Sequence, residues 1–250
     1  MLRLPYLTCL LICSSFCCSA LAQPIATSQP SASESSASES AAPKSAADEN
    51  ASDAKALPVV SFTMDFPESQ PEHYVIAVPS DGPGHYESSG RLRSDSDESD
   101  TFAFDFPISS ETRSRIFALA AQAGYFRKDL DAHRKNMAFT GNKTLRYTEA
   151  KGTYESTYNY SSNSGAEELT RLFQDLSATL EFGHRLDYDS RYQKLALNEE
   201  LKRMQELARN QSIAEVAAIR PILERIAADS SVVNVARARA RQLLEAPGGR

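Results

Sequence analysis

The sequence predicts an α+β protein, in which a mainly antiparallel sheet carries helices on one face and is followed by an all-helical C-terminal tail. Apolar and polar residues alternate in several short runs between residues 58 and 160, as is typical of half-buried strands. Two longer segments, near residues 110–124 and 164–183, and the chain after about residue 188 instead repeat apolar residues at helical spacing. This order favours amphipathic helices packed on one face of an antiparallel sheet.

The first four strands are expected before residue 107. Alternation begins at Val60, with apolar side chains on one face of the strand and polar ones on the other. The Asp81-Gly82-Pro83-Gly84 run predicts a turn between the second and third strands, because Gly and Pro favour the backbone angles of tight turns. The expected ranges are 59–66, 74–78, 85–88 and 101–106.

Two helices and a hairpin are expected next. Ser109 or Ser110 would cap a helix that stops at Gly124, and strands at 143–149 and 153–160 would join at a Lys-Gly turn. A second helix would begin at a capping box, Ser164 to Glu167, and end before Gly183. Its apolar stripe is Leu169, Leu172, Phe173, Leu176 and Leu180.

The tail is expected to be helical and to depend on the sheet for its stability. A second capping box spans Ser212 to Glu215, Pro221 should kink a helix or mark its restart, and a last helix should begin near Asp229. The tail carries too few apolar residues for a core of its own, so it should pack against the helix of residues 164–183. Residues 213–244 also resemble a single HEAT-type helical hairpin.

The N-terminus indicates export. Residues 1–22 have a basic start, an apolar run and Ala20-Leu21-Ala22 before Gln23, which predicts a signal peptide. Lipid attachment at Cys17 or Cys18 is the alternative. Residues 23–57 are rich in Ser and Ala and have almost nothing to bury, so a disordered leader is expected. The predicted organisation is thus signal peptide 1–22, leader 23–57, α+β domain 58–184 and helical C-terminal cap 185–247.

Composition excludes several kinds of function. All four cysteines lie at positions 9, 13, 17 and 18, so a cleaved chain would have no thiol nucleophile and no disulfide. Residues 58–107 hold ten acidic and two basic residues, which argues against nucleic acid as a partner. No stretch after the signal suits a transmembrane segment. No cofactor is expected, and the predicted location is periplasmic or extracellular.

Three polar clusters are candidate sites. Asp95, Asp97, Glu98 and Asp100 offer oxygen ligands to a cation, although a solvated loop explains them as well. Asp129, Asp131 and His133 alternate and would present three ligands on one side of an extended segment, unless they form a plain surface loop. His184 beside acidic residues would suit acid or base chemistry, but a histidine near a helix end also suits the helix dipole.

The preferred candidate site is a tyrosine face on the second hairpin, because an aromatic ring with a polar tip serves at interfaces and in cores alike. Either a partner contacts these rings or they pack in the core. The set is Tyr147, Tyr154, Tyr158 and Tyr160.

The layout of signal, Ser/Ala-rich leader, Tyr- and Phe-rich sheet and helical tail is similar to that of exported bacterial proteins of unknown function. The resemblance implies a compartment and no activity. The leading hypothesis is therefore a non-enzymatic binding or interaction module of the cell envelope. The alternative is a secreted hydrolase or metal-dependent enzyme that uses Asp129, Asp131, His133 or His184, and such an enzyme would need several of these groups to converge in one pocket.

Overall fold

The computed structural model describes residues 57–67, 69–91 and 99–246. The predicted signal peptide, the predicted leader up to residue 56, and Asp95, Asp97 and Glu98 lie outside the described residues. Within these ranges no helix is long and apolar enough to cross a membrane.

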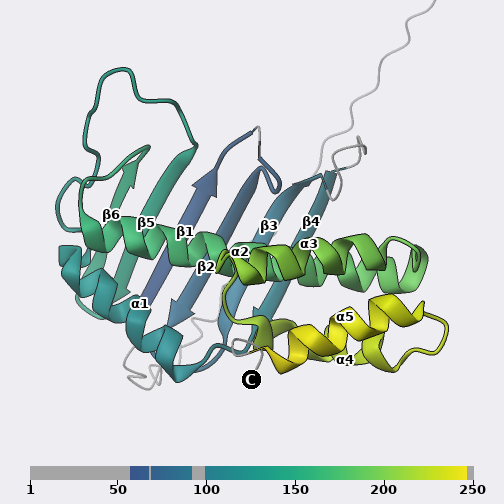
Figure 1. The fold of residues 1–250 in the computed structure, drawn as a ribbon. Helices are drawn as coiled ribbons and strands as arrows, with labels where there is room; N and C mark the ends of the chain where they lie inside the picture. The colour runs from purple at the N-terminus through teal and green to yellow at the C-terminus, as the bar shows by residue number, and fades with distance from the viewer. Residues whose placement is uncertain (1–56, 68, 92–98, 247–250) are drawn as a thin grey trace, which may run out of the picture. The chain divides into compact units, whose positions relative to one another are not determined.

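Six antiparallel strands form one sheet in the order β4-β3-β2-β1-β5-β6 (Figure 1). The predicted antiparallel α+β fold is confirmed. Consecutive strands lie side by side except β4 and β5, and β1 pairs with both β2 and β5 and so joins the two halves of the sheet. The strands are β1 (Val59–Asp65), β2 (His73–Pro79), β3 (Gly84–Arg91), β4 (Ser99–Phe106), β5 (Asn142–Glu149) and β6 (Gly152–Tyr158).

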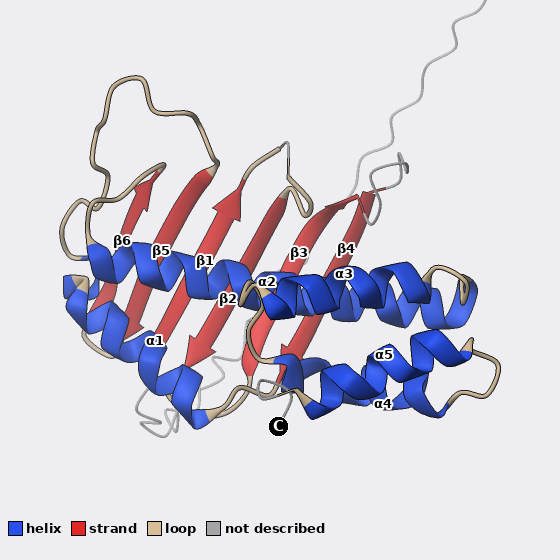
Figure 2. Cartoon of the chain, viewed as in Figure 1, coloured by secondary structure: helices blue, strands red, loops and turns tan. Residues whose placement is uncertain are grey.

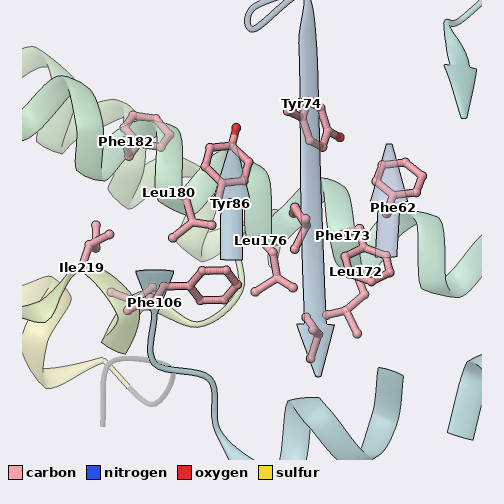
Figure 3. Packing of buried hydrophobic residues seen from close by; sticks show 14 of the residues in the cluster. Phe62, Tyr74, Tyr86, Phe106, Leu172, Phe173, Leu176, Leu180, Phe182 and Ile219 are labelled. Carbon is pink, nitrogen blue, oxygen red and sulfur yellow. The ribbon is translucent and has the colours of Figure 1, made fainter. Parts of the chain in front are cut away.

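Two helices, α1 (Ser110–Gln122) and α2 (Ser164–Tyr192), cover one face of the sheet (Figure 2). The alternation beginning at Val60 directs that residue and Phe62 under the helices, where both are fully buried. The Phe62 ring stacks on Phe173 of α2, with ring centroids 5.4 Å apart. Figure 3 shows this aromatic and aliphatic layer between sheet and helix.

Helix α2 differs from its predicted form at both ends. Its N-cap is Asn163, whose side chain accepts from the Ala166 N–H, so the expected Ser164 capping box is wrong by one position. The helix also continues past Gly183, so this glycine is not a helix stop. It serves instead as a packing position. A Cβ atom there would lie 2.4 Å from Cγ2 of Ile219, so only a residue without a side chain lets the tail approach. The expected boundary at 184/185 therefore falls inside α2.

The tail comprises α3 (Leu197–Arg209), a 3₁₀ turn η2 (Val216–Ile219), α4 (Arg220–Ala228) and α5 (Asn234–Glu245). Pro221 occupies the first turn of α4, as expected for a restart. The expected cap at Ser212–Glu215 is wrong. Glu215 has a left-handed backbone, and its carboxylate accepts from the Ser109 hydroxyl at 2.5 Å, at the start of α1.

The tail is anchored to α2 as well as to α1. The Thr179 hydroxyl of α2 donates to the Ala214 carbonyl at 2.5 Å, and the Ala214 N–H donates to the Asp175 carbonyl. Helix α3 doubles back alongside the C-terminal half of α2 (Figure 1). The two helices thereby create the wall of the cleft described next.

Candidate functional site

A cleft of about 890 Å³ opens between α2, α3 and the connection from β1 to β2. We call it the α2/α3 cleft. Its volume lies within the ~300–1,000 Å³ range of small-ligand sites. The lining residues that matter chemically are Tyr74 from β2, Ser177, Glu181 and Arg185 from α2, and Glu200 and Arg203 from α3.

Helical spacing explains why polar side chains meet there. Ser177, Glu181 and Arg185 follow one another at four-residue intervals, so they form a single row along α2. This row runs beside the apolar stripe that faces the sheet, and the turn at residues 193–196 brings α3 back against it. A row that would face solvent on a lone helix thus becomes the floor of a cleft.

Glu181 is the central polar group of this floor, and its residue is only 9% exposed. Its Oε1 atom accepts two hydroxyl hydrogen bonds, from Tyr86 at 2.7 Å and from Ser88 at 2.7 Å. Burial raises the pKa of the Tyr86 phenol well above its ordinary value, which keeps the hydroxyl protonated. Two sheet residues therefore hold one oxygen of a helix carboxylate, which is the arrangement that a buried charge requires.

The second oxygen of Glu181 is held far less tightly. Arg185 NH1 lies 3.9 Å from Oε2, beyond hydrogen-bond length, and Arg185 Nε reaches Glu200 at 3.4 Å. The guanidinium also lies over the Phe182 ring, 4.6 Å from its centroid, where a cation–π contact holds it. Arg203 approaches Glu200 at 3.4 Å. The cleft thus combines three acidic side chains, with Glu206, and two basic ones in a loose network.

The predicted tyrosine set lies elsewhere and does not act as a single surface. Tyr147 and Tyr158 are buried under the helices, and the Tyr158 hydroxyl bonds to Thr170 of α2 at 2.5 Å. Tyr154 and Tyr160 are half-buried, with Arg127 and Arg134 over their rings at 4.4 and 4.9 Å. A partner-binding role for this set stays a prediction, and only Tyr154 and Tyr160 present area to a partner.

Asp129, Asp131 and His133 do come together, but on an exposed loop. His133 Nε2 lies 2.8 Å from Asp129, and His133 Nδ1 lies 3.5 Å from Asp131. The hydrogen bond that His133 makes to Asp129 raises the pKa of His133, which favours the protonated ring beside the two carboxylates. Over the described ranges, no group of three or more His, Cys, Asp or Glu side chains has a metal-binding arrangement.

His184 occupies a third place, at the edge of the sheet. Its ring stacks on Phe102 of β4 with centroids 4.0 Å apart, and Nε2 lies 3.3 Å from Asp100. Neither residue lines the α2/α3 cleft. His184 therefore attaches α2 to the edge strand, a packing role that its position in the sequence did not indicate.

The sequence patterns did not indicate the α2/α3 cleft. The useful signal was the row Ser177, Glu181, Arg185 next to an apolar stripe on a helix that another helix follows at once. Taken alone, that row is the ordinary solvent face of an amphipathic helix. Only the return of α3 makes this row part of a cleft.

Comparison with known proteins adds no relative from which a role could be transferred. No family model matches this chain, and no curated protein matches its sequence.

Proposed function

We propose that this protein is a non-enzymatic binding module, exported to the cell envelope, that holds a polar group of its partner in the α2/α3 cleft. The observation that carries the proposal is the buried carboxylate of Glu181 on the floor of a cleft of about 890 Å³. A cleft of that size with a few convergent polar groups is the usual form of a ligand site. Export rests on the signal-like residues 1–22.

The placement of the candidate catalytic residues supports binding over the enzyme alternative. Asp129 and His133 pair on an exposed loop, whereas His184 stacks on Phe102 at the edge of the sheet. Neither group lines the cleft. An acid, a base and a bound substrate would have to meet within hydrogen-bond reach, so residues in separate places support no shared reaction.

A substitution that fills the cleft tests the proposal. Ala178 lines the cleft and is half-buried, so Ala178→Trp should occupy the space that a ligand would use. The matched control is Ala118→Trp, on the exposed side of α1. Each protein, made as the mature chain, would be used to capture partners from an envelope extract, after its melting temperature has been measured.

We expect the wild type and Ala118→Trp to retain the same partner and Ala178→Trp to lose it. Equal retention by both tryptophan variants would remove the cleft as the binding site. Tyr160→Ala, added to the series, separates the tyrosine surface from the cleft, because its half-buried ring lies outside the cleft lining.

A further inference from the structure

We propose that the α2/α3 cleft binds a cation, namely an ammonium or guanidinium group, through the free side of the Glu181 carboxylate. This inference rests on the proposed function and names the chemistry of the ligand. The ligand is either a small polyamine-like molecule or the basic side chain of a partner, since both present the same group.

The argument begins with how the two oxygens of Glu181 are used. Oε1 already accepts from Tyr86 and Ser88, which fixes the carboxylate in place from the side of the sheet. Among the described residues, the cationic group beside Oε2 is Arg185, whose NH1 lies 3.9 Å away. A carboxylate oxygen accepts charge-assisted hydrogen bonds at ~2.7–2.9 Å. A donor from a ligand would therefore satisfy an oxygen that Tyr86 and Ser88 orient and that, in the part of the chain that the structure describes, has no hydrogen bond of its own.

The ion pairs of the cleft are longer than two well-formed exposed pairs elsewhere on the protein. Arg115 reaches Glu168 at 2.6 Å and Arg146 reaches Glu155 at 2.7 Å, although both pairs are exposed. The cleft pairs lie between 3.4 and 3.9 Å, even though Glu181 and Glu200 are buried. Because buried charges are costly unless well paired, the loose pairs leave favourable interaction energy for an incoming cation.

The expected sign of the ligand's charge follows from the acidic and basic side chains that line the cleft. Glu181, Glu200 and Glu206 outnumber Arg185 and Arg203 along the lining. Arg185 lies near Glu200 and over the Phe182 ring, and its NH1 atom stays 3.9 Å from Glu181 Oε2. An anion entering the cleft would have to approach the fixed carboxylate of Glu181. A cation meets that carboxylate directly, with the Tyr74 ring in the same lining.

Calorimetric titration of the mature protein at low ionic strength tests this inference with defined probes. Agmatine carries an ammonium and a guanidinium group, and succinate is the anionic probe. Glu181→Gln keeps an acceptor for Tyr86 and Ser88 while removing the charge, and Ala178→Trp blocks the space with the network intact. Glu155→Gln, on the far face of the sheet, is matched in charge change and should have no effect.

We expect the wild type and Glu155→Gln to bind agmatine equally, and Glu181→Gln to bind it about tenfold more weakly or worse. Ala178→Trp should lose it too, which tests the site even if Glu181→Gln unfolds. Equal affinity for Glu181→Gln, preference for succinate, or no agmatine binding would overturn the inference. If Ala178→Trp loses partner capture while agmatine fails to bind, the cleft function stands and only its cationic ligand is wrong.

Discussion

The two faces of the sheet are formed by the same six strands but differ in burial. On the face under α1 and α2, alternate residues of β1, β2, β3 and β5 are buried. The residues between them, on the other face, are half-buried or exposed and are not covered by any described element (Figure 2). The buried members include Val60, Phe62, Ile76, Tyr86 and Leu145, and their neighbours on the open face include Ser61, Thr63, Val75, Ala77 and Arg146.

The open face is organised by cross-strand pairs rather than by packing. Arg146 of β5 bonds to Glu155 of β6 at 2.7 Å, and His85 of β3 bonds to Asp105 of β4 at 2.6 Å. Both pairs are in direct register. Exposed pairs of this kind contribute little stability each. The covered face should therefore hold most of the stability, and the open face should respond mainly to pH and salt.

The largest difference between the faces should come from Phe62→Ala. Its ring is fully buried and stacked on Phe173, so truncation loses apolar burial and leaves a cavity. We expect the free energy of unfolding to fall by about 3–5 kcal/mol. Thr63→Ala, the next residue on the open face, should cost less than about 1 kcal/mol. Urea unfolding measures both changes. Equal losses of unfolding free energy would contradict the claim that the covered face holds most of the stability.

A smaller loss is expected from the polar part of the covered face. Tyr86→Phe removes one of the two hydroxyl donors of the Glu181 Oε1 atom, and with it the Ser177 contact at 3.0 Å. A hydrogen bond to a buried charge is worth about 1–3 kcal/mol, and the free energy of unfolding should fall by that amount. Tyr154→Phe is the control, because its half-buried ring packs beneath Arg127 and lies outside the Glu181 cluster. A loss of similar size in Tyr154→Phe would show that removing a tyrosine hydroxyl is costly whether or not it bonds to Glu181.

Much of the fold could be predicted because local patterns and tertiary packing agree. The strand beginning at Val60 alternates strictly, and its helix-facing side is the one with Phe62 and Met64. Ser109 caps α1 as expected. The errors occurred where distant contacts decide the local structure. Gly183 looks like a helix stop until Ile219 packs on it, and Glu215 looks like a cap residue until it bonds to Ser109.

The candidate site was harder to predict for the same reason. The residue type of the hairpin tyrosines suits a binding surface, but the sequence does not indicate which face of the sheet the helices cover. Tyr147 and Tyr158 turned out to lie beneath them. Glu181 shows the opposite case. A charged residue on a helix is expected to be exposed to solvent, but α3 packs against α2 and buries this one. Both cases depend on the path of the chain between elements, which local periodicity does not encode.

The smallest effect should come from the open face and should depend on pH. The hydrogen bond to Asp105, with a second one to Glu87, raises the pKa of His85 above its ordinary value. Its contribution to stability is thus complete below the unfolded pKa of about 6.5 and is lost as the pH rises through the folded pKa. The side chain is 44% exposed, so solvent screening should limit the change to a few tenths of a kcal/mol.

Urea unfolding at about pH 5 and about pH 8 should show a smaller difference in unfolding free energy for His85→Gln than for the wild type. The comparison must be between proteins, because Asp129 also raises the pKa of His133 and acts in the same direction. An identical pH dependence in both proteins would show that the His85 pair is too screened to matter.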